Sequence, residues 1–181
     1  TIVAVFDSMY ATSLHHAAPA AASRPFDAER DGLIIAEGGA TLILEELEHA
    51  KARGAPILAE VIGFGTNSDG LHITDPSAER MQQCMQLALA DAKLPPSAIG
   101  FISAHATATE SGDIAEAAAT HAAFGERTPV TALKSYFGHS LGASSAIEPW
   151  LAVAMMNEEW VAPVRNFARL DPRCAPLGII T

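Results

Sequence analysis

Hydrophobic and polar positions along the chain alternate between short apolar runs and longer segments with helical spacing. Runs rich in β-branched residues predict buried strands. These runs occupy residues 2–6, 56–65, 99–105 and 130–134. Segments of good helix formers bounded by capping residues, Gly or Pro predict helices. These segments occupy residues 45–54, 76–93, 112–125 and 140–157. Residues 11–28 show no period and predict a loop. Strands that alternate with helices predict a layered α/β fold with largely parallel pairing.

The composition narrows the class of protein. Hydrophobic residues make up 49% and charged residues 18% of the 181 residues, which excludes a mainly disordered chain. Eleven Lys and Arg against 21 Asp and Glu give a net charge of −10. Such a surface repels a phosphate backbone, and no basic stripe offsets the repulsion, so the chain is not expected to bind nucleic acid.

Cysteine usage and the chain ends suggest where the protein works. Cys84 and Cys174 lie far apart without a CxxC pattern, which favours a reducing compartment, so we expect a cytoplasmic protein. No apolar run reaches membrane-spanning length, and the opening residues TIVAVFDSMY lack the features of a signal peptide. Because the chain opens directly with strand-like residues, we expect it to be a piece of something longer.

Two candidate sites lie at the ends of predicted strands. His105 follows the apolar run FISA, Lys134 ends another predicted strand, and His139 occupies a Gly-flanked turn before a helix. Ligands bind at the carboxyl ends of strands in α/β sheets, because loops and helix N-termini converge there. A lone His at a strand end is usually structural, but two in matching contexts favour function. We therefore expect both rings to face one pocket, with Lys134 close to them.

Three stretches together resemble a known family. They are SRPFDAERDGLIIAEGGATLILEELEHAKARGAPILAEVIGFGTNSDG, AHATATESGD and TALKSYFGHSLGASSAIE. Their order and spacing resemble the C-terminal half of the β-ketoacyl-[acyl carrier protein] synthases, the elongating condensing enzymes. The resemblance implies an α/β, thiolase-like layered fold. Residues 1–28 would end the N-terminal half and connect it, and residues 29–181 would form the C-terminal half-domain, truncated at its C-terminus.

The resemblance also implies roles for individual residues. His105 and His139 match the family's active-site histidines, and Lys134 matches the lysine that supports them. The other matched residues are acidic residues of the supporting network and threonines that contact the phosphopantetheine arm. They are Asp113, Glu116 and Glu148 for the network, and Thr107 and Thr109 for the arm.

The implied reaction is a decarboxylative Claisen condensation in fatty acid or polyketide-type chain elongation. Two imidazole N–H donors aimed at a developing thioester oxygen form an oxyanion site without a metal. Lys134 would orient the histidines, and the carboxylates would hold the lysine and the ring tautomers. No metal and no resident cofactor are expected, because the phosphopantetheine arm of the carrier protein enters as part of the substrate.

Two features depart from the family pattern. The usual HGTST reads HATAT here, so Ala106 and Ala108 replace Gly and Ser. The family's nucleophilic cysteine lies in an N-terminal half that this chain lacks. Cys84 falls inside a predicted helix and Cys174 in a Pro-flanked loop, so neither occupies the strand-to-helix turn that a nucleophile needs. We therefore expect an acyltransferase that is inactive as this fragment alone.

The expected partners are an acyl carrier protein and a second subunit, as a homodimer or as a ketosynthase/chain-length-factor heterodimer. Because carrier proteins are acidic, docking needs a local basic patch, for which Arg24 and Arg30 are the candidates, followed by Lys51 and Arg53. One alternative is a catalytically silent chain-length-factor-like subunit, which would be expected to lose the histidines. Another is a stand-alone binding module, which would expose faces that normally pack against the other half.

Overall fold

A computed structural model describes residues 2–72 and 74–181 of the chain. These residues form a parallel three-stranded sheet in the order β1-β2-β3. The strands are short: β1 is Ile102–Ser103, β2 is Pro129–Thr131 and β3 is Gly178–Ile179. Parallel pairing of β1 with β2 confirms the expectation for residues 99–105 and 130–134, although both strands are shorter than predicted.

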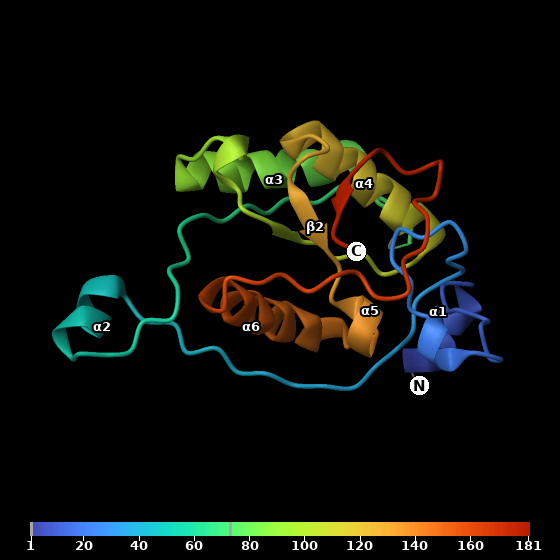
Figure 1. Ribbon diagram of the computed structural model, residues 1–181, viewed down its shortest axis with the longest axis horizontal. Helices are drawn as coiled ribbons and strands as arrows, with labels where there is room; N and C mark the ends of the chain where they lie inside the picture. The colour runs from blue at the N-terminus through green and yellow to red at the C-terminus, as the bar shows by residue number, and fades with distance from the viewer. Residues whose placement is uncertain (1, 73) are drawn as a thin grey trace.

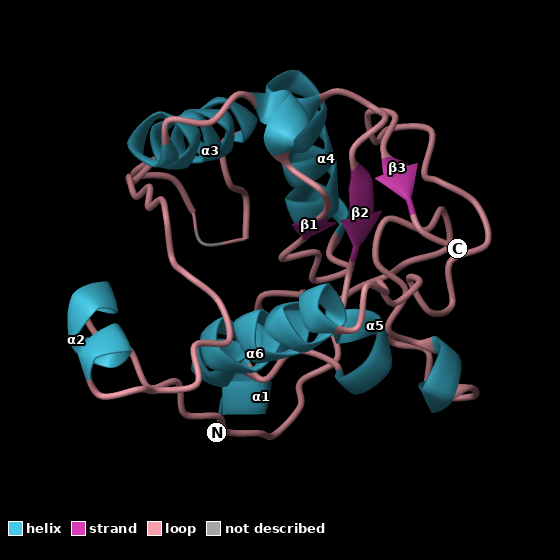
Figure 2. Cartoon of the chain, turned by 60° about the vertical axis from the view of Figure 1, so that its left-hand side comes forward, coloured by secondary structure: helices cyan, strands magenta, loops and turns pink. Residues whose placement is uncertain are grey.

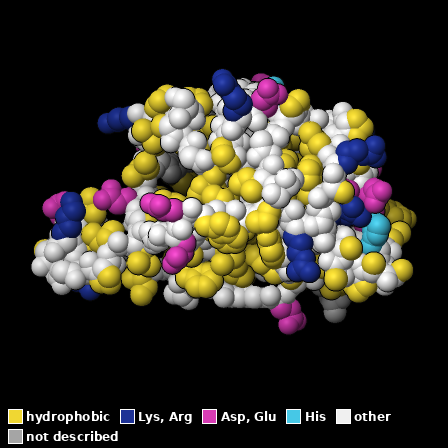
Figure 3. All heavy atoms as spheres, viewed as in Figure 1, with side chains coloured by type: hydrophobic (Ala, Val, Ile, Leu, Met, Phe, Trp, Pro, Cys, Tyr) yellow, Lys and Arg dark blue, Asp and Glu magenta, His cyan; other side chains and the backbone are white. Residues whose placement is uncertain are grey.

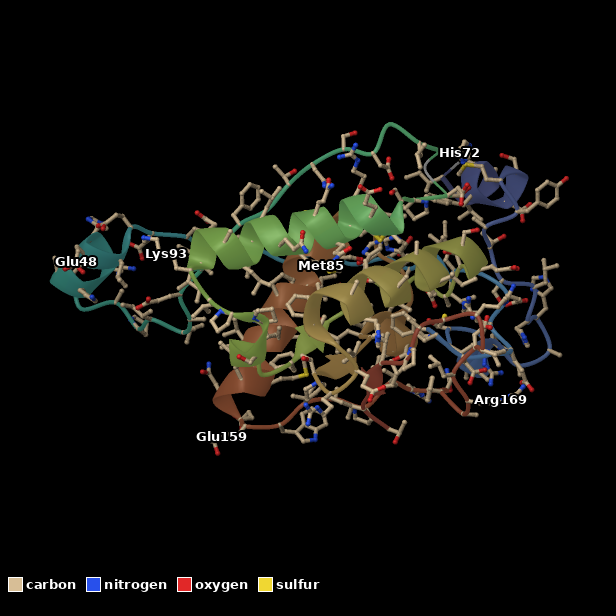
Figure 4. The ribbon with its side chains drawn as sticks, turned by 90° about the horizontal axis from the view of Figure 1, so that it is seen from above. Glu48, His72, Met85, Lys93, Glu159 and Arg169 are labelled. Carbon is tan, nitrogen blue, oxygen red and sulfur yellow. The ribbon has the colours of Figure 1, made fainter. Side chains whose placement is uncertain are left out.

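Helices lie on both sides of this sheet (Figures 1 and 2). The α-helices are α1 (Ile2–Ser8), α2 (Leu47–Ala52), α3 (Ala78–Ala92), α4 (Glu110–Phe124), α5 (Lys134–Phe137) and α6 (Ser144–Asn157). Short 3-10 helices occupy Pro19–Ala21, Pro96–Ala98 and Leu141–Ala143. Helices α3 and α4 pack together on one side, and α5 and α6 lie on the other (Figure 1). Helix α2 stands away from this body, with Glu48 at the far end of the molecule (Figure 4).

The main core lies between the sheet and α4 and consists mostly of small side chains. Its buried members are Phe26, Ala104, Ala106, Ala117, Val130, Ala132, Val164 and Cys174. A smaller cluster of Leu133, Met155 and Ala162 joins α6 to the chain after β2. Alanines at these positions bring α4 close to the strands, so the loop after β1 and the first turn of α4 are tightly packed.

Residues 2–6 form part of α1, so the predicted strand is wrong. Ile2, Val3 and Val5 are all more than half exposed, and α1 has no buried residue. A strand needs a neighbour for its main-chain donors and acceptors, whereas a helix satisfies them within the segment. An apolar run this short does not distinguish the two by its pattern.

Residues 56–65 also form no strand, although the segment lies along α3. The Phe64 N–H donates to Asp91 Oδ2 at 3.0 Å, and Cys84 Sγ donates to the Gly65 carbonyl at 3.1 Å. A Cβ at Gly63 would lie 2.5 Å from the Ala88 carbonyl oxygen, so glycine is required for this close approach. The predicted strand is replaced by an extended segment whose neighbour is a helix.

Apolar side chains are exposed over part of the surface. Hydrophobic atoms gather over the face that carries α6 in Figure 3, where Trp150 and Met156 are more than half exposed. The segment around α2 is similar, with Ile43 and Val61 more than four-fifths exposed. Large contiguous apolar patches are typical of faces that pack against another chain or segment. Among the described residues, no helix combines the length and the apolar character needed to cross a membrane.

Candidate active site

His105 and His139 come together at one end of the sheet. Their ring centroids lie 5.1 Å apart, and the ring planes are nearly perpendicular at 86°. His105 follows β1 after one residue, and His139 lies in the turn between α5 and the 3-10 helix at Leu141–Ala143. The expectation that the two rings face one pocket is confirmed, because both line the same cavity.

The position of His139 depends on the chain segment that precedes α2. The His139 N–H donates to the Ile34 carbonyl at 2.6 Å, and the Ala36 N–H donates to the His139 carbonyl at 3.0 Å. Gly138 has φ +79°, and a Cβ there would lie 2.7 Å from the Ile34 carbonyl oxygen. The Gly-flanked turn is therefore a requirement of this close approach.

Lys134 is buried between the two histidine loops and α6. Its Nζ lies 2.5 Å from Glu148 Oε1 and 3.3 Å from His105 Nδ1, with only 1% of the residue exposed. Strand β2 ends at Thr131, and Lys134 begins α5, so the predicted position at a strand end is shifted by a short turn. The carbonyl of Lys134 accepts a hydrogen bond from Ser23 Oγ at 2.6 Å, which ties the turn to the N-terminal loop.

The hydrogen bonds at Nδ1 define the tautomer of both rings. The Lys134 ammonium lies within hydrogen-bond distance of His105 Nδ1, and the Leu141 N–H donates to His139 Nδ1 at 3.2 Å. An ammonium and a main-chain N–H have only donors, so Nδ1 accepts in each ring. A neutral ring whose Nδ1 accepts carries its proton on Nε2.

Both rings are neutral at pH 7. Burial, the Lys134 ammonium and His139 lower the pKa of His105 from 6.5 to about 4, in decreasing order of effect. Burial and then Lys134 lower the pKa of His139 to about 4 as well. Each ring therefore offers one Nε2–H donor to a group in the cavity.

Asp113 and Glu116 hold the main chain of residues 105–109. The carboxylate of Glu116 accepts from the His105 and Ala106 N–H groups at 2.7 and 2.6 Å. Asp113 accepts from the Ala108 N–H at 3.1 Å. Both lie on the buried face of α4, as their spacing predicts. Their hydrogen bonds go to main-chain donors, so Asp113 and Glu116 hold the loop that carries His105. Of the three carboxylates, Glu148 is the one that bonds Lys134.

The pKa values of these acids follow from their surroundings. Burial raises the pKa of Asp113 to about 7, against the opposite effect of the Phe26 and Ala108 N–H groups and Arg30. Burial also raises the pKa of Glu116, although two main-chain N–H groups oppose it. Burial raises the pKa of Glu148, and its hydrogen bond and charge interaction with Lys134 lower it.

The two alanines that depart from the family motif adopt the left-handed region. Ala106 has φ +35° and Ala108 has φ +65°, and both are fully buried. Residues other than Gly take this conformation at a cost, so the loop is strained and must be held by its neighbours. Glycine at the position of Ala106, as in the usual family motif, would carry less of this strain.

Thr107 and Thr109 lie on the same side of the loop. Their hydroxyl oxygens are 2.9 Å apart, and both side chains line the cavity. This cavity has a volume of about 350 Å³ and is lined by Phe6, Ala11, Leu33, Thr74, Pro76, Met81, His105, Thr107, Thr109, Gly112, Glu116 and His139. Polar groups therefore gather at one part of a mainly apolar cavity, the usual character of a small-molecule site.

The structure contradicts Arg30 and Arg24 as a docking patch, whereas Lys51 and Arg53 are half exposed. The Arg30 side chain is 0% exposed and lies 2.5 Å from Asp171, so it has no surface to offer a partner. Arg24 is 13% exposed on its side chain and pairs with Asp27 at 3.0 Å and Glu29 at 3.3 Å. A sequence does not reveal that a basic residue in a loop is covered by acidic segments distant along the chain.

Neither cysteine occupies the cavity as the structure describes it. Cys174 is buried in the core, and burial raises the pKa of its thiol to about 11, so it stays protonated at neutral pH. Cys84 lies within α3 and donates to a main-chain carbonyl.

The sequence did not predict two residues that support His139. They are Leu141, whose N–H donates to His139 Nδ1, and Ser144, whose Oγ lies 3.3 Å from the same nitrogen. A serine five residues after His139 at a helix start was the available signal.

Comparison with known proteins defines the family. The family described as "Beta-ketoacyl synthase, C-terminal domain" matches residues 58–168. The chain is 42% identical to 3-oxoacyl-[acyl-carrier-protein] synthase 1 of Escherichia coli (strain K12) over 178 residues, which are 97% of this chain and 43% of that protein.

Similar solved structures indicate the same family. The crystal structure of a beta-ketoacyl synthase from Burkholderia phymatum STM815 superposes with a TM-score of 0.97 at 56% identity, over 99% of this chain and 44% of that one. AntDE:AntF, a type II PKS acyl-carrier protein in complex with its ketosynthase bound to the hexaketide, superposes with a TM-score of 0.89 at 39% identity, over 98% of this chain and 45% of that one. The fold is therefore the thiolase-like α/β fold of the condensing enzymes. The chain belongs to the β-ketoacyl synthase family and carries its C-terminal domain. It spans less than half the length of these relatives.

Proposed function

We propose that this chain supplies the decarboxylation part of a β-ketoacyl-[acyl carrier protein] synthase site, in which His105 and His139 are paired hydrogen-bond donors. The observation that carries the proposal is the tautomer shared by the two rings. Each Nδ1 lies against a group that can only donate, the Lys134 ammonium for His105 and the Leu141 N–H for His139, whose Nδ1 also lies near the Ser144 hydroxyl. This leaves both Nε2–H groups available to a ligand. Two neutral donors with ring centroids 5.1 Å apart suit one developing oxyanion.

The reaction places this charge on the malonyl thioester oxygen. The bond between the α-carbon and the carboxylate carbon breaks, and carbon dioxide leaves. The electron pair of that bond stays with the α-carbon and forms an enolate. The enolate oxygen accepts hydrogen bonds from the two Nε2–H groups. The enolate carbon then attacks the carbonyl of an acyl group held as a thioester on a cysteine. The new carbon–carbon bond forms, and the cysteine thiolate is expelled. Both rings stay neutral throughout, because pKa values of about 4 keep them from taking up a second proton near pH 7.

Lys134 has a polarising role in this scheme. Its ammonium donates toward His105 Nδ1 at 3.3 Å and draws electron density through the ring. A ring polarised at Nδ1 is a stronger donor at Nε2. Glu148, 2.5 Å from the ammonium, offsets the cost of burying the positive charge and fixes where it points.

The substrate arrives on an acyl carrier protein in this proposal. Thr107 and Thr109 contact the phosphopantetheine arm from the wall of the cavity, beside both histidines. The chain needs no resident cofactor, because the arm is part of the substrate. A similar structure contains an acyl-carrier protein in complex with its ketosynthase, which supports a carrier protein as the partner. The assembly is a homodimer or a ketosynthase/chain-length-factor heterodimer.

The competing function is a silent chain-length-factor-like subunit. Retention of both histidines, the lysine and its glutamate favours the enzyme, because a silent subunit has no need of two neutral donors in one cavity. The cysteine nucleophile has to come from outside this chain, since Cys174 is buried and its thiol is protonated at neutral pH. The chain by itself is therefore expected to show no condensing activity.

The test uses the assembled enzyme, meaning the protein or complex in which this chain is joined by the remaining part of the fold. Malonyl decarboxylation and single-turnover acylation are measured for His105→Ala and His139→Ala. Loss of one oxyanion donor is expected to slow decarboxylation by about 10²–10³-fold and to affect acylation less. His49→Ala is the control, because that side chain is 69% exposed on α2. Decarboxylation that is unchanged in both active-site variants would refute the proposal.

A further inference from the structure

Arg30 is a buried cation outside the set of residues assigned to the reaction. Its side chain is 0% exposed, and its guanidinium reaches several segments of the chain. Nη1 donates to the Asp27 carbonyl at 3.0 Å and lies 2.5 Å from Asp171 Oδ2. Nη2 donates to the Glu110 carbonyl at 3.0 Å, and Nε donates to the Thr109 carbonyl at 3.3 Å. Arg30 therefore binds the junction between the active-site loop and α4.

Asp113 connects Arg30 with the active-site loop. Its Oδ2 lies 3.4 Å from Arg30 Nε, and both side chains are 0% exposed. The same carboxylate accepts from the Ala108 N–H at 3.1 Å and from the Phe26 N–H at 2.7 Å. A buried carboxylate is costly unless it is paired and hydrogen-bonded. Arg30 supplies the positive charge, and the two main-chain groups supply the hydrogen bonds.

Different groups hold the two ends of the loop at residues 105–109. Glu116 binds the main chain at the His105 end. The Thr109 end depends on Asp113 and Arg30. The two alanines between these ends have left-handed φ angles, which persist only where the surroundings over-determine the conformation. Loss of the Arg30 anchor would release one end of a strained loop.

We propose that Arg30 is a positioning residue of the condensing site, which holds the loop that presents His105 and Thr109 by pairing with Asp113. This inference rests on the function proposed above. Arginine is required rather than lysine, because the planar guanidinium donates in several directions at once. Asp171, which Arg173 also binds at 2.7 Å, lies against Nη1 of the Arg30 guanidinium. Figure 1 shows this red C-terminal segment beside the blue N-terminal segment and α4.

A structural role alone would not change the pH dependence of the reaction, whereas this role does. The charged or titratable groups that face Asp113 are Arg30, Glu116 and Cys174, and Arg30 is the cation among them. Burial raises the pKa of Asp113 to about 7, and Arg30 opposes the rise. Without Arg30 the pKa of Asp113 rises further, so the carboxylate is protonated at higher pH. The pH below which decarboxylation declines therefore moves up.

The experiment compares four variants of the assembled enzyme, namely Arg30→Met, Arg30→Lys, Asp113→Asn and the double variant Arg30→Met/Asp113→Asn. Malonyl decarboxylation is followed as a function of pH, together with KM for the carrier-bound substrate and the unfolding midpoint. Arg30→Met is expected to lower kcat by about 10–100-fold, the usual range for a lost supporting contact, and to move the acid limb to higher pH. Arg30→Lys keeps the charge but fewer donors, so its kcat falls between wild type and Arg30→Met.

The double variant separates charge pairing from mere packing. Asn at 113 keeps an acceptor oxygen for the Ala108 N–H, loses the acceptor for the Phe26 N–H, and carries no charge that would need a partner. The double variant is therefore expected to recover part of the kcat lost in Arg30→Met. It also serves if Arg30→Met fails to fold. Arg127→Met is the control, because Arg127 is an exposed arginine outside the site and outside the candidate docking residues.

Two outcomes overturn this inference. One is that decarboxylation by Arg30→Met declines below the same pH as in wild type. The other is that kcat of the double variant is no higher than kcat of Arg30→Met. If Arg30→Met does not fold, the double variant is compared with Asp113→Asn. Once residue 113 carries no charge, the loss of Arg30 is expected to lower kcat little further, and a large further loss overturns the inference. The function proposed above is judged separately by His105→Ala and His139→Ala. If those two variants lose decarboxylation while Arg30→Met behaves as wild type, only the role of Arg30 is refuted.

Discussion

The main-chain N–H of Leu141 donates to Nδ1 of His139 over 3.2 Å. Leu141 itself adopts φ +55°, a conformation that a residue with a branched side chain rarely takes. The strained turn aims this N–H back at the ring two residues earlier and leaves Nε2 as the protonated nitrogen. Backbone strain at this position therefore selects a tautomer, which is a functional property of the side chain.

The first prediction concerns these tautomers. In the assembled enzyme labelled with ¹⁵N-histidine, His105 and His139 are expected to be neutral with the proton on Nε2 at pH 7. Because burial and Lys134 lower both pKa values to about 4, the rings become protonated only as the pH falls through that region. The measurement is the ¹⁵N chemical shift of each ring nitrogen between pH 8 and the lowest pH at which the protein stays folded. Spectra of His105→Ala and His139→Ala assign the signals. A proton on Nδ1, or titration near the ordinary value of 6.5, would contradict the prediction.

The second prediction concerns the buried pair of Lys134 and Glu148. Glu148→Gln removes the negative charge and leaves the buried ammonium without its partner, which is expected to lower the free energy of unfolding by about 3 kcal/mol. The matched control is Glu48→Gln on α2. Glu48 pairs there with Lys51, and their side chains are 75% and 53% exposed. That change is expected to cost under about 1 kcal/mol. Urea unfolding of the assembled enzyme measures both, and equal effects would mean that the buried pair is not what holds Lys134.

The third prediction concerns the turn before His139. Gly138→Ala forces a side chain into a left-handed φ and against the Ile34 carbonyl, so a loss of about 1–3 kcal/mol in the free energy of unfolding is expected. The main-chain bond that holds His139 is displaced with it, and decarboxylation falls. Gly142→Ala is the control, since a Cβ there meets no atom within 4 Å and its φ lies outside the left-handed region. Wild-type unfolding and wild-type decarboxylation in Gly138→Ala would show that the close approach is not needed.

Much of the architecture was accessible from local pattern. The helices predicted at residues 76–93 and 112–125 are found as α3 and α4, because helical spacing and terminal signals act over a few residues. The site was accessible for a related reason. Segments that follow adjacent parallel strands are brought to one edge of the sheet. His105 follows β1, His139 follows β2 after the short helix α5, and the two rings meet there.

Short apolar runs were not decided by local pattern. Residues 2–6 and 56–65 have the β-branched composition of strands, yet one becomes α1 and the other lies along α3. A strand exists only where a second strand supplies donors and acceptors, and a sequence of four to ten residues does not carry that information.

Arg30 shows most directly what only the tertiary structure decided. In the sequence, Arg30 is a basic residue of an acidic chain and is therefore a candidate for binding an acidic partner. The fold brings to it the carboxylate of Asp171 from 141 residues away and the start of α4 from about 80 residues away, and covers its side chain completely. Sequence by itself determined that His105 follows a strand and that His139 lies in a glycine-flanked turn before a helix. Whether a charge is exposed or buried depended on which distant segments close over it, because burial and ion pairing are set by long-range packing.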